Sequence, residues 1–295
     1  MTIQIQQQLR ARQINESDLS LVVDLLARKF PSCSREYFDR GLDRLARRPA
    51  PTGYPRFGYM LESQGAPVGV VLTIFSTRSS NGKTSVRCNL SSWCIDEAFS
   101  GCGPFLSAIA VRHKDVTYIS ESAAPHTWRL MEAQGFVRFC EGRMLTFPAL
   151  TCRQRIGKAR ARRFDEREDY GPDLSREERD ILIAHSNYGC LAYVVEEERG
   201  AHPFVFLRRR IPRRLLSTLE LIYCRSVEDY RHYAGPLGRA LMARGAFSVV
   251  LDANHPIPDL VGEYSPVVMG KYIKGPALPR FGDLAFSEAA LFGRP

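Results

Sequence analysis

Apolar side chains recur along the first 150 residues at two spacings, and these spacings predict helices and strands. Between 19 and 30 they follow one helical face. A second helical pattern, at 34–45, predicts a surface segment able to act as a lid. Two β-rich runs, 57–62 and 67–75, flank a short turn and predict an antiparallel hairpin.

Strands and helices alternate after the hairpin. Pro104 stands in the first turn of a helical pattern, where its missing N–H costs nothing, and Gly135 ends the next helix as a C-cap glycine does. The predicted elements are a strand at 85–95, a helix at 104–112, a strand at 115–121, a helix at 125–134 and a strand at 136–140.

The second half of the chain repeats part of this order. Ser175 and Glu178 form a capping-box pattern that starts a helix. Trp93-Cys94 and Gly103-Pro104 are echoed by Tyr223-Cys224 and Gly235-Pro236, which predicts a tandem repeat. The later elements are a hairpin at 190–198 and 203–210, a strand at 216–225, a helix within 228–244 and a strand at 246–252.

A basic segment separates the two halves. Six Lys or Arg residues lie within 153–163, and Gly171-Pro172 then breaks the chain. We therefore expect domains at 1–150 and 173–295, joined by a basic linker at 151–172. A solvated linker is a simpler account of this run than a nucleic-acid site, so no nucleic-acid partner is expected.

Composition narrows the class of protein. The longest apolar stretch, 68–75, is far shorter than the roughly 20 residues of a membrane-spanning helix, so no membrane association is expected. Residues 1–12 lack the apolar centre of a secretory signal, which predicts a cytoplasmic location. The eight cysteines form no C-x-x-C pair, which argues against zinc and for buried thiols.

The net charge of +9 comes almost entirely from arginine, since only six of the 41 basic residues are lysine. Arginine suits the planar recognition of phosphate or carboxylate, so an anionic partner such as CoA, a nucleotide or tRNA fits this charge. An arginine-rich source genome explains it equally well.

Two motifs give the first half a specific resemblance. The segment 124–136 is a helix that ends in Gly135-Phe136, and 98–103 is a glycine-containing loop that follows the long strand. With the element order, these segments resemble the GNAT superfamily of acyl-CoA-dependent N-acyltransferases. The resemblance implies an α/β (α+β) fold of two GNAT-like mixed-sheet units in tandem, each with a central sheet flanked by helices. It also implies acetyl-CoA or another acyl-CoA as co-substrate.

The loop is the predicted pyrophosphate site. Glycine lets backbone N–H groups approach a phosphate closely, and the start of the next helix adds its positive dipole end. An ordinary tight turn is the alternative account. Ala98 replaces the Arg or Gln usual in the family, and Met131 replaces a Tyr that protonates the leaving thiolate. The assigned loop residues are Ser100, Gly101, Cys102 and Gly103.

The resemblance also assigns residues at the ends of the two central strands. Backbone N–H groups of Cys94, Ile95 and Asp96 are expected to contact the thioester carbonyl. The Asp96 side chain could act as a base through water, and it equally fits a cap of the following helix. Ser91 and Ser92 lie on the same strand, and the sequence does not tell which of them faces the site. Cys94 is not expected to act as a thiol nucleophile.

After the next strand, His126 and Glu121 are the expected catalytic pair. An unperturbed histidine side chain changes its charge near neutral pH, which suits an acid or base, so His126 is the leading candidate, although it equally fits a helix start without chemistry. Glu121 has a solvated ion pair with Arg129 as its alternative. Ser122 and Arg129 are assigned to the acyl-CoA contacts.

The predicted function is transfer of an acyl group, acetyl by preference, from CoA to an amine or hydroxyl of an unidentified acceptor: a small molecule, a sugar or a peptide. Two alternatives remain open. One is a non-catalytic acyl-CoA-binding or regulatory protein, favoured by Ala98 and Met131; the other is an aminoacyl-tRNA-dependent transferase.

Overall fold

The computed structural model describes residues 9–80, 83–151, 159–198, 200–209, 217–278 and 280–294. A single sheet runs through the whole molecule, in the strand order β1-β2-β3-β4-β5-β12-β6-β11-β10-β9-β8-β7. Its strands are β1 (Leu9–Gln13), β2 (Gly58–Ser63), β3 (Ala66–Ser80), β4 (Lys83–Ile95), β5 (Val116–Ser120), β6 (Val137–Thr146), β7 (Arg160–Arg163), β8 (Leu191–Glu197), β9 (Gly200–Arg209), β10 (Ser217–Cys224), β11 (Ala246–Ala253) and β12 (Gly262–Lys274).

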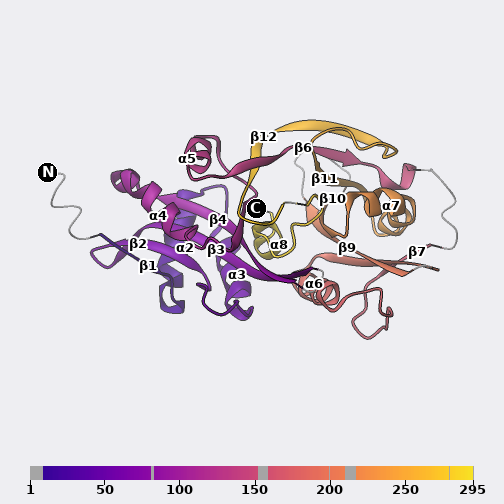
Figure 1. Cartoon of the computed structure of the whole chain (residues 1–295), viewed down its shortest axis with the longest axis horizontal. Coiled ribbons are helices and arrows are strands. Elements are labelled where there is room, and N and C mark those ends of the chain that lie inside the picture. Colours follow the sequence, from indigo (N-terminus) through magenta and orange to yellow (C-terminus); the bar gives the residue numbers. More distant parts are fainter. Residues whose placement is uncertain are drawn as a thin grey trace.

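The two halves exchange their closing strands. β6, which ends the first half, pairs with β11 through Val249 and Thr146, whereas β12 from the end of the chain pairs with β5 through Tyr272 and Ser120. β6 and β12 also pair with each other in the middle of the sheet. Figure 1 shows the outcome, an elongated molecule in which the last strand lies beside the first half. The sheet therefore continues without a break from one half to the other.

Helices cover both faces of the sheet. On one face a single apolar core takes side chains from α2, α3, α6 and α8, so both halves contribute to it. On the other face α4 and α5 cover the first half, and α7 covers the second. The helices are α2 (Leu19–Lys29), α3 (Arg35–Arg47), α4 (Gly103–Ala110), α5 (Trp128–Ala133), α6 (Arg176–Asn187), α7 (Val227–Met242) and α8 (Glu288–Phe292).

The shared core corrects one expectation about the first half. The segment predicted as a lid is α3, and its apolar face is buried instead of lying loose on the surface. Phe292 of α8 packs against Gly41, and the Arg44 guanidinium donates to the Leu291 carbonyl at 2.7 Å. The C-terminal helix is thus fixed between α3 and the sheet, near the centre of the molecule in Figure 1.

The structure also corrects the proposed match between Gly103-Pro104 and Gly235-Pro236. The first pair begins α4, whereas the second lies inside α7, so the two pairs are not equivalent. The other two dipeptides both stand at an irregularity of their strand: Trp93 is one of the two bulged residues of β4, whereas Tyr223 follows the bulged Ile222 of β10. The sequence patterns also missed two edge strands, β1 and β7. β7 lies within the predicted linker, and residues 152–158 of that linker lie outside the described residues.

No helix in the described part of the chain is long and apolar enough to span a membrane. The seven cysteines of this part are all free thiols, four of them buried, and Cys152 lies outside it.

Candidate active site

The two central parallel strands of the first half come apart at their carboxyl ends. β4 and β5 pair from Val86 and Val116 as far as Leu90 and Ser120, where β5 ends while β4 continues to Ile95. Ligands of open α/β sheets bind at such carboxyl ends. We call this place the first split.

A bulge in β4 lies directly beside the first split. Ser91 faces Leu72 of β3 and Cys94 faces Val70, so the two residues between them oppose the single Val71. Ser92, at the centre of the bulge, has a φ of +46°, an unusual value for a residue other than glycine. Bulges of this kind re-aim backbone and side chains and are common next to active sites.

The backbone just after the bulge refines the predicted carbonyl contact. The Asp96 N–H donates to the Val68 carbonyl of β3 at 2.7 Å and is therefore not available to a ligand. Along an antiparallel strand, successive N–H groups point alternately toward the partner strand and away from it. Since the Asp96 N–H points toward β3, the N–H of Ile95, which pairs with Gly69, points away from β3 and toward the split. Of the three residues assigned from the sequence, Ile95 is the one whose N–H is aimed correctly.

The Asp96 carboxylate is engaged elsewhere. It forms ion pairs with Arg28 at 3.0 Å and with Lys29 at 2.8 Å, both on α2. These pairs neutralise an acid that stands beside the predicted pyrophosphate loop. Asp96 is thus an anchor for α2 and not a free base.

The predicted pyrophosphate loop forms a short 3-10 helix, η2 (Glu97–Cys102), that leads directly into α4. Ser100 and Gly101 are exposed, and a methyl group at Gly101 would meet no other atom within 4 Å. The first turn of α4 contains no acidic side chain, which leaves its positive dipole end uncompensated. The Trp93 indole N–H, on the strand beside this loop, is buried and has no hydrogen-bond partner among the described residues. The Phe99 and Gly103 N–H groups bond within this loop, so its attraction for an anion rests on its exposed surface and on the uncompensated start of α4.

A carboxylate from the far end of the chain lies across the first split. Glu288, the first residue of α8, accepts from the Ser92 hydroxyl at 3.2 Å and from the Ser122 hydroxyl at 3.5 Å. Its N–H donates to the Asn89 side-chain oxygen at 3.0 Å. Glu288 is partly exposed, and burial of its carboxyl group raises its pKa, against the lowering effect of the nearby serine hydroxyls. It is thus a carboxylate held between the ends of β4 and β5.

The sequence patterns gave no signal for Glu288, since it lies 196 positions from Ser92. They also left open which of the two serines faces the site. Ser91 is buried and Ser92 is half-buried, and their hydroxyls lie 3.2 Å apart, so both belong to the network around Glu288.

The residues predicted after β5 separate into two environments. Glu121 is buried at 5% exposure and accepts from the Asn89 amide at 3.4 Å, which excludes a solvated pair with Arg129. Burial raises the pKa of Glu121. Ser122 is exposed at the split. His126, in the 3-10 helix η3 (Pro125–Thr127), and Arg129, on α5, are also exposed, and within the described part of the chain neither forms a hydrogen bond or ion pair with Glu288 or its serines. The structure thus brings Ser122 to Glu288 and buries Glu121 beneath them.

The thiols near the site are poor nucleophiles. Burial raises the pKa of Cys94 to about 12, so its thiolate is scarce near neutral pH. Cys102, at the end of η2, is partly exposed. The described residues contain no group of three or more His, Cys, Asp or Glu side chains able to hold a metal ion.

Two buried ion pairs lie on the sheet near the C-terminal segment. Lys271 of β12 and Asp252 of β11 approach to 2.7 Å, and each side chain is at most 6% exposed. Arg294 donates to Glu220 of β10 at 2.8 Å. Burial would raise the pKa of Glu220, but Arg294 and Lys271 lower it to about 2. The second pair ties the end of the chain to the second half.

The second half has its own parallel pair, and the chain itself fills the place where that pair ends. β10 and β11 pair up to Glu220 and Val250. Beyond that point the Cys224 N–H donates to the Gly282 carbonyl and the Leu284 N–H to the Ile222 carbonyl, each at 2.8 Å. The helix that follows, α7, carries Glu228 and Asp229 in its first turn, where negative charge opposes a phosphate. We call this filled place the second split.

No family model and no curated protein sequence matches the chain. Solved structures match its fold at low sequence identity. A GCN5-related N-acetyltransferase from Anabaena variabilis gives a TM-score of 0.60 at 8% identity, covering 90% of this chain and 72% of that one. A GCN5-related N-acetyltransferase from Kribbella flavida gives 0.56 at 14% identity, covering 90% and 70%. The chain therefore has the fold of the GNAT superfamily, as the motifs at 98–103 and 124–136 predicted.

Proposed function

We propose that this protein transfers an acyl group from CoA to an amine acceptor at the first split. The observation that carries the proposal is Glu288, a carboxylate held across the ends of β4 and β5 beside the Ser92 bulge. Residues 1–150 form the acyl-CoA-binding half in this account. Residues 173–295 form a half that binds no acyl-CoA itself but supplies Glu288.

The acyl-CoA is proposed to enter beside α4. Its pyrophosphate meets the exposed Ser100 and Gly101, and the arm of the molecule continues into the split. The Ile95 N–H then donates to the thioester carbonyl oxygen, which gains negative charge as the acceptor attacks. Acetyl is the simplest acyl group; nothing about the site fixes the length of the chain.

Glu288 is proposed to be the general base. An amine acceptor arrives largely as an ammonium ion, and an ionised Glu288 takes its proton. The nitrogen then bonds to the carbonyl carbon, the carbon–sulfur bond breaks, and the nitrogen releases its second proton to water. Met131 is buried and carries no acidic proton, so it does not serve the leaving thiolate. We propose that His126, which is exposed four residues after Ser122, gives the leaving thiolate its proton.

A thiol-release assay with acetyl-CoA and a panel of amines tests this proposal. The wild type should release CoA only when an acceptor is present. Glu288→Gln should keep acetyl-CoA binding and lose turnover, and the matched control Glu263→Gln, an exposed position on β12, should behave as wild type. Equal turnover in Glu288→Gln and wild type would remove Glu288 from the chemistry.

A second candidate is a protein that binds acyl-CoA without turning it over. Met131 favours it, because the position has no proton to give. The same assay separates the two candidates: tight binding without thiol release on any amine or hydroxyl acceptor supports the second.

A further inference from the structure

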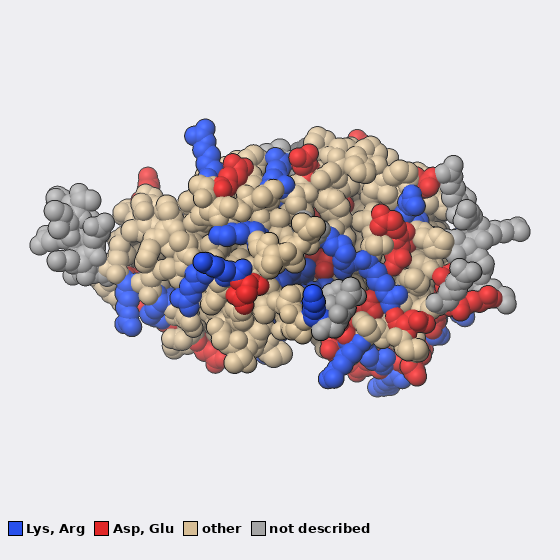
Figure 2. Space-filling model, viewed as in Figure 1, with Lys and Arg blue, Asp and Glu red and all other residues tan. Residues whose placement is uncertain are grey.

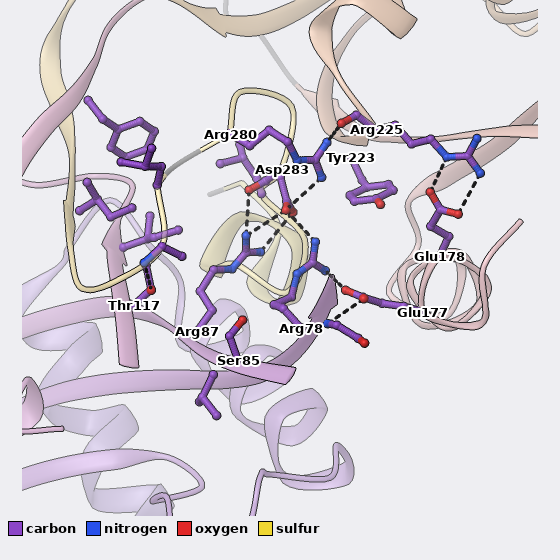
Figure 3. Close-up of a pocket in the computed structure, with 18 of the residues that line it drawn as sticks. Arg78, Ser85, Arg87, Thr117, Glu177, Glu178, Tyr223, Arg225, Arg280 and Asp283 are labelled. Atoms are coloured by element: carbon purple, nitrogen blue, oxygen red, sulfur yellow. Dashed lines mark hydrogen bonds and ion pairs between the residues drawn. The ribbon is translucent and has the colours of Figure 1, made fainter. Parts of the chain in front are cut away.

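A cavity of about 700 Å³ lies between the two halves, next to the second split. Its walls come from the ends of β3 and β10, the starts of β4, β5 and α6, and residues on either side of position 279, namely 277, 278, 280, 283 and 284. Figure 3 shows side chains from both halves and from the C-terminal segment pointing into one space. Arg87 and Ser92 stand five positions apart on β4, about 16 Å at the rise of a strand, so the arginine of the cavity on this strand lies away from the first split.

Arginines dominate the charge of this cavity. Asp283 lies among three guanidinium groups, at 2.6 Å from Arg78 and 3.2 Å from both Arg87 and Arg280. These neighbours outweigh burial and hold the pKa of Asp283 well below its usual range. The three guanidinium groups therefore already bind one carboxylate, that of Asp283.

The positive charge exceeds what the lining carboxylates neutralise. Asp252 also lines the cavity, but its charge is taken up by Lys271. Four arginines then face three carboxylates: Arg78, Arg87, Arg225 and Arg280 against Glu177, Glu178 and Asp283. Figure 2 shows basic side chains gathered near the middle of the molecule, with acidic ones among them. One further negative charge would balance this wall.

Arg78 offers a donor for such a charge. Its Nη1 lies 3.3 Å from Glu177 Oε1, yet it is buried and makes no hydrogen bond within the described part of the chain. Arg78 and Arg280 also lie over the Tyr223 ring, at 5.8 and 5.5 Å from its centre, which fixes the direction of both guanidinium groups.

The remainder of the wall is apolar and open to solvent at one side. The side chain of Leu278 is 92% exposed at its edge. A volume of this size is typical of sites for small organic ligands, which combine apolar walls with a few placed polar groups. The other apolar residues of the lining are Val86, Ile119, Phe139, Ile273, Ala277 and Leu284.

We propose that this cavity binds a small amphipathic anion, with a carboxylate or a phosphate monoester at the arginines and an apolar body along the wall. The site is independent of acyl transfer at the first split. A guanidinium group binds phosphate and carboxylate through the same planar pair of N–H donors. One experiment therefore tests both head groups.

Calorimetric titration of the full-length protein with hexanoate and hexyl phosphate tests the site, with hexylammonium as the probe of opposite charge. At least one of the two anions should bind once per chain, with equal affinity in the presence of saturating acetyl-CoA. Hexylammonium should not bind. Failure of both anions to bind at millimolar concentration would overturn the proposal, as would equal binding of hexylammonium.

Two variants locate the binding. Arg78→Gln should raise the Kd at least tenfold, whereas Arg112→Gln, on the opposite face over Tyr59, should leave it unchanged. Leu278→Asp, at an exposed position that folding does not depend on, should weaken binding roughly three- to fivefold relative to Leu278→Asn by repelling the anion. Wild-type affinity in both Arg78→Gln and Leu278→Asp would place the ligand elsewhere and refute the site.

Discussion

At the scale of single residues, the proposed acyl transfer depends on Glu288 as its general base. Burial raises the pKa of its carboxyl group, so it becomes protonated at a higher pH than an ordinary glutamic acid. A general base must be ionised. We therefore predict that kcat/KM falls with the titration of Glu288 as pH is lowered, at a higher pH than an ordinary glutamic acid would give.

Glu288→Gln should lower kcat roughly 10²- to 10⁴-fold and abolish that acid limb. A steady-state pH profile of both proteins measures the effect. An acid limb that persists unchanged in the variant would assign it to another group, and Glu121 and His126 would be the next to test.

The ion pair between Arg294 and Glu220 makes a second prediction at this scale. The folded-state pKa of Glu220 is depressed to about 2, so the stabilisation is present above the unfolded pKa, near 4.5, and is lost as pH falls toward 2. For a depression of the pKa from 4.5 to about 2 it amounts to roughly 3 kcal/mol.

Urea unfolding at pH 6 and pH 3 measures this contribution. Glu220→Gln should be less stable than wild type at pH 6, and the difference should shrink at pH 3. The exposed control Glu263→Gln should show no such pattern. A difference that does not change with pH would mean that the pair contributes no charge-dependent stability.

Sequence reasoning found only part of this site. Gly101 and Ile95 are local to recognisable motifs: Gly101 is exposed in the loop before α4, and the Ile95 N–H faces the first split. Glu288 carries no such signal, because a lone glutamate at a short helix start fits any capped helix. Its partners Ser92 and Ser122 become meaningful only when the end of the chain returns to β4.

At the scale of elements, the position of α8 rests on its contact with α3. A methyl group at Gly41 would lie 2.1 Å from the Phe292 ring, which is fully buried and has no room to move. Gly41→Ala should therefore displace α8, cost about 1–3 kcal/mol of stability, and lower kcat through Glu288.

A compensating substitution separates packing from other effects. Phe292→Leu removes ring atoms at the contact, so the double variant should recover turnover relative to Gly41→Ala alone. Thermal unfolding and thiol-release assays of the single and double variants check this. No recovery would indicate that the contact between α3 and α8 does not set the position of Glu288.

Most elements followed from periodicity and turn chemistry. The long strand β4 and the helix α6 appear nearly where apolar patterns and the Ser175 capping box predicted them. The pairing of strands did not follow. β6 and β12 satisfy the same local rules whether each pairs within its own half or is exchanged, so the exchange is visible only in three dimensions.

At the scale of the whole molecule, two halves of similar order have become unequal. The first split lies near the start of α4, whose first turn carries no acidic side chain. In the second split, the segment 282–284 forms backbone hydrogen bonds with the edge of β10. The same C-terminal segment then continues into α8 and completes the first split. The second half is in this account a support for the first, and one ligand site for acyl-CoA remains per chain.

Acetyl-CoA stoichiometry tests this central claim most directly. Calorimetric titration should give one acetyl-CoA per chain in the wild type. Binding should be lost in Ser100→Asp, where a carboxylate meets the pyrophosphate, and kept in Glu228→Gln at the start of α7. Two sites per chain, or full binding in Ser100→Asp, would contradict the account.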